Sequence, residues 1–546
     1  MTGILRGVPG RRPIRPRQAN FEEPDGHDAL STASSASRAA RAIRGIPLAH
    51  LAAIGVFAVA FVIYLATLLP GPSFGDWAEM QFIPAQLGIP HPTGYPLYVL
   101  LGKLFSLLPI GTWAYRADLL SAVAAAGAAA SAVLIATRLG VRPLLAAAAG
   151  LSLAVTGTLW LEAAFSEMNG LHLFLVAAVI HRALVWRAER RDSDLLLGGL
   201  LAGLAVANHL LALTVVPIVI LFVLVDARSR LFQRPLLLVQ TALLGLIGVS
   251  LYLFIPLRAL AGPPSIYASF LTWDGFSSLV TGAQFRGQMH FSSEESLIAA
   301  WKAVPDVLGQ FVARSNVVFV AGGLIGGSIL LIRDRWAALM LGLVVASCIF
   351  FFANYVGDLD HYLLVAWLVV AVWLAVAAEA FFAWLDRRFP SLAEFARLDV
   401  LALALPLVIA TGNWTTHDES DNHVGEEFAP LVFSELPPDA VLLTYWDALT
   451  NLTYAHCVEG QRPDLSLRAY DVAARVVCDP VTGPLEEVAR QRPVFALFAF
   501  ESELDPLRQS FELVEGPRLA LPYGDRDLDH EGVLYQLVPI EGAAAP

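Results

Sequence analysis

The stretch LAHLAAIGVFAVAFVIYLATLLPGPSFGDWAEM, residues 48–80, sets a pattern that recurs along the chain. It begins with about twenty apolar residues without a charge, long enough to cross the ~30 Å hydrocarbon core of a bilayer as a helix. Directly after them come two acids, Asp76 and Glu79, in a segment that also contains Pro and Gly. This order predicts a membrane-spanning helix with ionisable side chains placed just beyond its end.

The composition extends this prediction to most of the chain. Of the 546 residues, 56% are hydrophobic and only 15% are charged, whereas a soluble protein carries about 25% charged residues. The mean hydropathy is +0.61, and the ~10-residue alternating segments of a transmembrane β-barrel are not seen. We therefore expect a polytopic α-helical membrane protein embedded in a lipid bilayer. No basic patch with interleaved aromatic residues occurs, so we expect no nucleic-acid partner.

Eleven membrane spans account for the apolar stretches. We place them at 47–69, 117–136, 143–160, 168–186, 194–208, 210–226, 236–256, 315–332, 336–353, 361–384 and 398–412. With the N-terminus in the cytoplasm, every connection from an even-numbered to an odd-numbered span is basic, as the positive-inside rule expects. These connections hold Arg138 and Arg142, then Arg187, Arg190 and Arg191, then Arg228, Arg230 and Arg234, then Arg333 and Arg335, then Arg387, Arg388 and Arg397.

The two ends of the chain differ from its apolar centre. Residues 1–46 are rich in Arg, Pro, Ser and Gly, so we expect a disordered, basic, cytoplasmic N-terminus rather than a secretory signal. An odd number of spans places residues 413–546 outside, after a transmembrane domain at 47–412. The host membrane suggested by the composition is that of a bacterial cell.

Residues 413–546 predict a small extracytoplasmic α/β domain. We expect strands at 440–445, 464–470, 493–500 and 532–540, with a helix at 448–460. Cys457 and Cys478 could form a disulfide in an oxidising compartment, whereas Cys348 lies in a span and is expected only to pack. Asn413 and Asn451 begin glycosylation sequons that matter only if the host glycosylates its outer proteins.

Polar side chains collect on the predicted outer face. A single such residue is best explained as a solvated loop residue, but ionisable groups at membrane depth usually face a cavity or one another. Since all five outer loops contribute, we expect a shared polar cavity. Its members are Asp76, Glu79, His91, Tyr95 and Arg116; Glu162, Glu167 and His172; Asn208 and His209; Arg258, Gln284 and Arg286; and Asn354, Tyr355, Asp358, Asp360, His361 and Tyr362.

These residue types suit one reaction well. A carboxylate beside a cavity is a candidate general base, and arginines are common bidentate partners of phosphate. Together they predict transfer of a sugar from a lipid phosphate to an acceptor hydroxyl that arrives from water. Asp358 and Asp360 form an Asp-x-Asp sequence whose oxygens could hold Mg²⁺ or Mn²⁺, although this spacing is common by chance.

The stretch GDWAEMQFIPAQLGIPHPTGYPLY, residues 75–98, resembles the opening of the domain-of-unknown-function 2723 family. That family is a branch of the GT-C membrane glycosyltransferases and includes protein O-mannosyltransferases of the transmembrane-protein-260 type. Asp76 and Glu79 match its D-x-x-E, and His91 begins its H-P-x-G-Y-P-L-Y. RADLLSA (116–122) is similar to a family stretch that has Asn where Asp118 stands here, and SEMNGLH (166–172) has Asn169 in place of an aromatic.

The resemblance, which covers roughly residues 47–384, implies a GT-C fold and a polyprenyl- or dolichyl-phosphate sugar as donor. It implies Asp76 as catalytic base, with Glu79 as second choice or partner. The acceptor would be a protein Ser/Thr or an envelope glycan, and mannose is suggested only by the relatives. We expect the substrates to be bound by His91, Tyr95, Arg116, Glu167, Asn208, His209, Arg258, Arg286, Asp358, Asp360 and Tyr362.

The same residues are compatible with three alternatives. The prolines and glycine of HPTGYP (91–96) could simply turn the chain into a surface helix at 97–108. The whole protein could be a transporter or flippase, although no internal repeat is seen. It could also be a membrane-anchored binding protein whose outer domain does the work, but an anchor has no need of acids at its helix ends.

Overall fold

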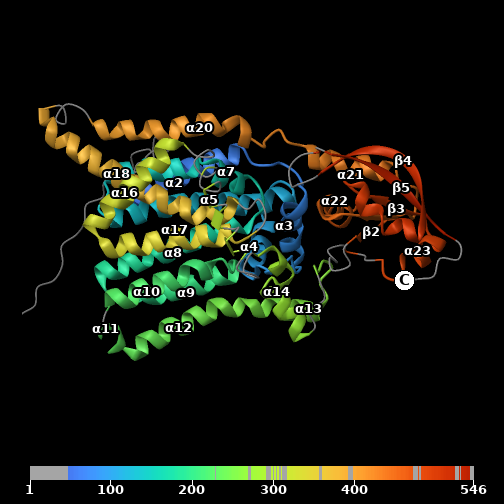
Figure 1. The fold of residues 1–546 in the computed structure, drawn as a ribbon, viewed down its shortest axis with the longest axis horizontal. Coiled ribbons are helices and arrows are strands. Elements are labelled where there is room, and N and C mark those ends of the chain that lie inside the picture. Colours follow the sequence, from blue (N-terminus) through green and yellow to red (C-terminus); the bar gives the residue numbers. More distant parts are fainter. Residues whose placement is uncertain are drawn as a thin grey trace, which may run out of the picture. The chain divides into compact units, whose positions relative to one another are not determined.

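The chain is known from a computed structural model, which describes residues 47–227, 229–267, 272–289, 316–355, 360–391, 397–470, 481–522 and 530–540, with a few short pieces between them. Residues 49–546 form one compact unit. Within it, a bundle of apolar helices is followed by a five-stranded sheet with its own helices (Figure 1). The predicted N-terminal segment 1–46 lies outside the described residues.

The helices follow the predicted spans closely. In order they are α2 (Leu48–Ala66), α3 (Gly75–Gln86), α4 (Pro96–Ser106), α5 (Trp113–Arg138), α6 (Pro143–Ala154), α7 (Gly157–Ala164), α8 (Met168–Glu189), α9 (Asp192–Asn208), α10 (Ala212–Ala227), α11 (Ser229–Phe232), α12 (Pro235–Val249), α13 (Phe254–Ala261), α14 (Trp273–Val280), α16 (Val317–Arg333), α17 (Arg335–Ala353), α18 (Leu364–Arg388) and α20 (Ala404–His417).

Seven helices in the described part of the chain are long and apolar enough to cross a membrane. They correspond to seven of the predicted spans and confirm the polytopic helical class. The bent pair α6 and α7 would make an eighth, and the other predicted spans coincide with the shorter helices α9, α10 and α16. The count of eleven spans therefore stays a prediction.

The predicted span 143–160 is not one straight helix. It breaks into α6 and α7, which meet at 65°, because Thr156 is extended (φ −65°, ψ 144°) and interrupts the helical hydrogen bonds. The break leaves backbone carbonyls without helical partners inside an apolar bundle, which is costly unless side chains replace them. The hydroxyl of Tyr64 donates to the Ala154 carbonyl at 2.7 Å, and the Asn413 amide donates to that of Val155 at 2.7 Å.

The arginine-rich connections meet at one end of the bundle. Arg142 pairs with Asp386 near the end of α18, and Arg187 pairs with both Asp226 and Asp334 from two other connections. These pairs agree with the prediction that the basic connections share one side. That this side is cytoplasmic stays a prediction.

The C-terminal part contains helices α21 (Val424–Ser434), α22 (Trp446–Thr453) and α23 (Leu485–Gln491). Its sheet has the strand order β2-β1-β3-β5-β4. The parallel strands β1 (Val441–Thr444), β2 (Ser466–Ala469) and β3 (Val494–Leu497) and the antiparallel β5 (His530–Pro539) match the predicted strands. The edge strand β4 (Phe511–Leu521) was not predicted. Cys457 and Cys478 form a disulfide.

This sheet domain shares a core with the helices that follow the first span. Phe74, Phe82 and Val99 from the α3–α4 region lie in one buried cluster with Phe428 and Leu449 from the C-terminal part. The fully buried Asn451 donates to the carbonyls of Ser73 and Gly425. A glycan therefore has no access to Asn451 in the folded chain, and its sequon is better explained by packing.

Candidate active site

The two predicted catalytic acids are positioned by the start of α3. Gly75 has φ +54°, a left-handed conformation that glycine adopts without strain, and it turns the chain into the helix. Asp76 lies in the first turn and Glu79 three residues later, so both side chains lie on the same face. After α3, Gly94 (φ +84°) and Tyr95 (φ +37°) turn the chain again, and Pro96 is at the first position of α4. The prediction that HPTGYP turns the chain into a helix is therefore confirmed.

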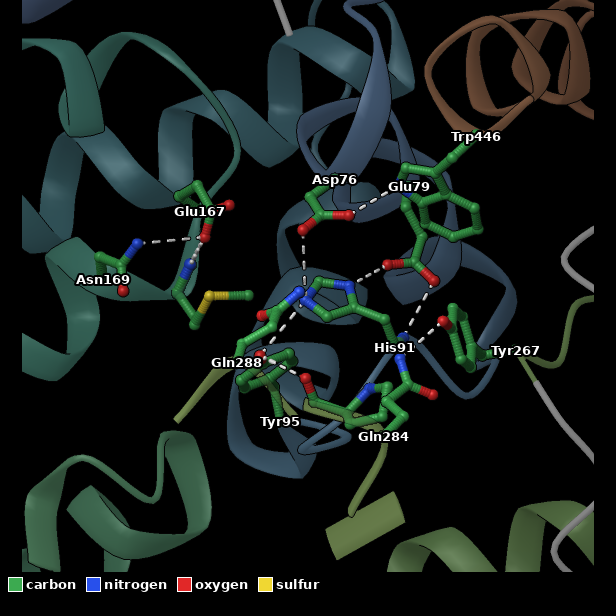
Figure 2. Close-up of polar contacts among 12 residues, drawn as sticks. Asp76, Glu79, His91, Tyr95, Glu167, Asn169, Tyr267, Gln284, Gln288 and Trp446 are labelled. Atoms are coloured by element: carbon green, nitrogen blue, oxygen red, sulfur yellow. Dashed lines mark hydrogen bonds and ion pairs between the residues drawn. The ribbon is translucent and has the colours of Figure 1, made fainter. Parts of the chain in front are cut away.

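His91 joins the two acids into one cluster (Figure 2). Its Nδ1 lies 2.5 Å from Glu79 Oε2, and its backbone N–H donates to Glu79 Oε1 at 3.0 Å. Its other ring nitrogen, Nε2, lies 3.6 Å from Asp76 Oδ2 and 3.2 Å from the Tyr95 hydroxyl. Asp76 Oδ1 accepts a hydrogen bond of 2.7 Å from Trp446 Nε1, at the start of α22.

The two carboxylates differ in accessibility. The Glu79 side chain is fully buried, whereas 43% of the Asp76 side chain is exposed. Burial raises the pKa of Glu79, and His91 opposes that effect. Burial alone would lower the pKa of His91, but the nearby charges of Asp76 and Glu79 raise it to about 10. His91 therefore holds a proton at neutral pH, and Asp76 is the carboxylate that a substrate can reach.

Several other predicted residues lie close to this cluster. The rings of His91 and Tyr95 are 5.1 Å apart, those of Tyr95 and His209 are 5.3 Å apart, and those of His209 and Tyr362 are 6.3 Å apart. The buried Glu167 accepts hydrogen bonds from its neighbours Met168 N and Asn169 Nδ2, and Figure 2 shows it beside Asp76.

Residues from distant segments complete the surroundings. Tyr267 lies between His91 and Trp446, with ring distances of 6.4 and 5.5 Å, and accepts from Gln284 Nε2. The Tyr355 hydroxyl donates to Gln288. The sequence did not predict Trp446 because it lies 370 residues from Asp76, and no local motif marks the contact. The Glu79–His91 pair could have been suspected, since both residues belong to one short motif.

The predicted arginines are engaged elsewhere. Arg116 donates to the carbonyls of Ser106, Ile110 and Gly111. Arg258 donates to the Leu87 carbonyl, and Arg286 to the Thr281 hydroxyl. Their predicted role as phosphate ligands stays a prediction.

Two further sets of predicted residues have different outcomes. Asp358 and the side chain of Asp360 lie outside the described residues. The side chain of Asn208 donates to the Met168 carbonyl.

Asp76, Glu79 and His91 could also hold a metal ion. Each offers one ligand atom, and the three atoms lie within 4.8 Å of one another. Carboxylate oxygens suit Mg²⁺ or Mn²⁺, and an imidazole suits transition metals. A metal ion would bind His91 through a ring nitrogen that carries no proton. The use of a metal ion at this site stays a prediction.

Sequence comparison shows which known proteins this chain is similar to. Residues 76–231 match the family model "Protein O-mannosyl-transferase TMEM260 N-terminal domain". The chain is 27% identical over 452 residues to the TMEM260 protein O-mannosyl-transferase of Mus musculus, which covers 76% of this chain and 62% of the mouse protein. It is 22% identical over 482 residues to the corresponding protein of Dictyostelium discoideum, covering 76% and 57%. The chain thus spans about three fifths of the length of these relatives.

A solved structure shares the architecture. The crystal structure of ArnT from Cupriavidus metallidurans bound to undecaprenyl phosphate matches with a TM-score of 0.58 and 16% identity, over 90% of this chain and 98% of ArnT. The chain therefore shares the fold of ArnT. By sequence, it is similar to TMEM260 protein O-mannosyl-transferases. Membership of the GT-C superfamily stays a prediction. The finer family label, domain of unknown function 2723, stays a prediction.

The buried Glu79–His91 pair predicts a specific dependence of stability on pH. Because folding raises the pKa of His91 from its ordinary value near 6.5 to about 10, its stabilising contribution is complete below about pH 6.5 and is lost as the pH rises to about 10. We expect the melting temperature of the wild type to fall more over this range than that of the Glu79→Gln/His91→Gln double variant.

The matched control is His423→Gln, because His423 is an exposed histidine paired with Glu426. Parallel melting curves for the wild type and the double variant would contradict the assignment of the proton to His91.

Proposed function

We propose that the chain is a membrane glycosyltransferase. It would move a sugar, mannose if the chain follows its relatives, from a polyprenyl- or dolichyl-phosphate donor to a hydroxyl of a protein Ser/Thr or an envelope glycan. The observation that carries this proposal is the accessible Asp76 carboxylate, fixed between Trp446 and the protonated His91. It lies in the segment that matches the O-mannosyltransferase model.

In the proposed reaction Asp76 is the general base. It takes the proton of the acceptor hydroxyl as the hydroxyl oxygen bonds to the anomeric carbon and the bond from that carbon to the lipid phosphate breaks. The phosphate leaves with the electron pair and stays on the lipid. His91 and Trp446 hold the two Asp76 oxygens, so that the carboxylate is oriented before substrate arrives. Glu79 acts through His91 as a positioning residue.

An apolar cavity supports a lipid-borne donor. It has a volume of about 630 Å³ and lies between α8, α9, α10 and α12. Val206, Val216 and Val249 line it towards the site, and Trp186 and Leu238 line it towards the arginine-rich end. A hydrocarbon chain would bury apolar surface there at about 25 cal/mol per Å².

The same proposal includes the number and orientation of the membrane spans, the host membrane and a possible metal cofactor. We place eleven spans in a bacterial cell membrane, with the N-terminus in the cytoplasm and the C-terminal sheet domain outside. The disulfide between Cys457 and Cys478 supports an oxidising compartment for that domain. The use of Mg²⁺ or Mn²⁺ stays a prediction, and comparing transfer with and without a chelator would test it.

Replacing the base tests the main proposal. We expect Asp76→Asn to lower the rate of sugar transfer by roughly 10²–10⁴-fold, the typical contribution of a general base, while binding of the lipid donor is kept. The measurement follows labelled sugar from undecaprenyl-phosphate mannose to a Ser/Thr peptide. Asp418→Asn, in an acid that accepts from another tryptophan, serves as control. Unchanged transfer by Asp76→Asn would remove the catalytic assignment.

The contact from the C-terminal domain gives a second test. Trp446→Phe keeps an aromatic ring but removes the donor to Asp76. Loss of a hydrogen bond to a charged group costs about 1.5 kcal/mol, so we expect kcat to fall roughly tenfold while KM for the donor changes little. Trp414→Phe is the matched control, since its Nε1 donates to Asp418. Equal effects of both replacements would show that the Trp446 contact only stabilises the fold.

The cavity predicts a dependence on donor chain length. Ala242 lines it and the adjacent Leu243 does not, although both lie on α12. We expect Ala242→Phe to raise KM several-fold for a long-chain donor but not for a donor with one or two isoprene units, because the larger ring fills the space. Leu243→Phe should leave both values unchanged. An equal response to the two donors would place the lipid chain elsewhere.

A further inference from the structure

Beyond Asp76 lies a second group of polar side chains that the proposed mechanism does not use. Glu162 on α7 is 5% exposed, and His172 on α8 is 4% exposed. Glu162 Oε1 lies 3.7 Å from His361 Nδ1. The buried Asn169 donates to Glu167, which Figure 2 shows on the side of Asp76 away from Tyr267. Glu162, Asn169 and His172 are more buried than Asp76.

Ring contacts connect this group with the acid cluster. His209 lies 5.3 Å from Tyr95 and 5.6 Å from His172, measured between ring centroids. Tyr362 lies between His209 and His361, at 6.3 and 4.4 Å. A series of neighbouring side chains thus leads from His91 through His209 to Glu162. We call Glu162, Asn169, His172, Asn208, His209 and His361 the inner subsite.

Three buried atoms of the inner subsite lack a hydrogen-bond partner among the residues that the structure describes. They are Glu162 Oε2, His172 Nδ1 and Asn208 Oδ1. A buried polar atom left unpaired destabilises the fold, so native proteins seldom keep several together without a ligand or ordered water. The Asn208 amide oxygen and an ionised Glu162 oxygen accept hydrogen bonds, so a ligand that donates hydrogen bonds would satisfy both.

The chemistry of the inner subsite favours hydroxyl groups over phosphate. Its acid Glu162 pairs with His361, and no Arg or Lys pairs with Glu162 in the described part of the chain. An anion would meet this carboxylate without a compensating cation. His209 Nδ1 accepts the Leu211 N–H at 3.1 Å, so the proton of the neutral ring is on Nε2, where it can donate. A polyol could donate hydroxyl hydrogens to these unpaired acceptors and could accept a hydrogen bond from His209 Nε2.

We propose that the inner subsite binds the hydroxyl groups of the sugar carried by the lipid donor. This inference rests on the proposed function and adds to it the residues that recognise the sugar. Glu162 and Asn208 accept sugar hydroxyl protons, and His172 and His209 contact the same ring from α8 and from the end of α9. The sugar thereby lies deeper than Asp76, whose exposed carboxylate faces the acceptor.

The test compares undecaprenyl phosphate with and without an attached sugar. Full-length protein in nanodiscs is titrated with undecaprenyl phosphate and with undecaprenyl phosphate carrying mannose, glucose or galactose. We expect the wild type to bind at least one glycosylated lipid more tightly than the bare phosphate. We expect Glu162→Gln to weaken that binding about tenfold, as for a lost hydrogen bond to a charged group, without changing the affinity for undecaprenyl phosphate.

A second variant covers the case in which Glu162→Gln does not fold. His172→Phe replaces an unpaired buried nitrogen by carbon at similar ring size, so it should melt no lower than the wild type. It should still reduce the preference for the glycosylated lipid several-fold. Glu419→Gln is the control, because Glu419 is also buried and accepts from Asn422 outside the inner subsite.

The outcomes separate the two proposals. If the wild type binds neither lipid, the proposed function fails and the inference fails with it. If the wild type binds both lipids and His172→Phe keeps the full sugar preference, the inner subsite is filled by water and the inference alone is overturned. An equal loss of affinity for both lipids in a folded Glu162→Gln variant would likewise show a structural role only.

Discussion

The buried contact between Glu79 and His91 is the interaction on which the rest of the site depends. A carboxylate with no solvent exposure cannot keep its charge without a partner, and His91 contacts the Glu79 carboxylate with both a ring nitrogen and its backbone N–H. This double contact ties the loop after α3 back onto the helix. It also leaves His91 Nε2 directed at Asp76 and Tyr95, so one pair helps to orient two further groups.

The C-terminal domain completes this arrangement. Its core is continuous with that of α3 and α4, and its helix α22 brings Trp446 to Asp76 (Figure 2). The Tyr454 hydroxyl, close after α22, accepts the backbone N–H of Ala114 at the start of α5. The sheet domain is therefore part of the wall of the candidate site. These contacts argue against the alternative that the helices are only a membrane anchor for a separate outer binding domain.

The sequence predicted most of the helices because twenty-residue apolar stretches have few alternatives in a membrane. It also predicted the two acids, since charged groups at a span end are unusual. It could not predict the bend at Thr156, which depends on carbonyl partners from Tyr64 and Asn413 far along the chain. The edge strand β4 was missed because its outward positions are polar and Gly516 and Pro517 interrupt the apolar pattern. Trp446 was missed because its role comes only from tertiary contact.

The polar groups of the site differ in their exposure to water. Asp76 is open to water, as an acceptor hydroxyl must arrive from there, whereas Glu162, His172 and Asn208 are shielded. Shielding strengthens each hydrogen bond to a bound hydroxyl because water no longer competes. The charges of Asp76 and Glu79 raise the pKa of His91 against the effect of burial, and the proton on His91 offsets part of the negative charge beside Asp76. A site so arranged can hold a neutral sugar tightly and still admit a polar acceptor to its anomeric carbon.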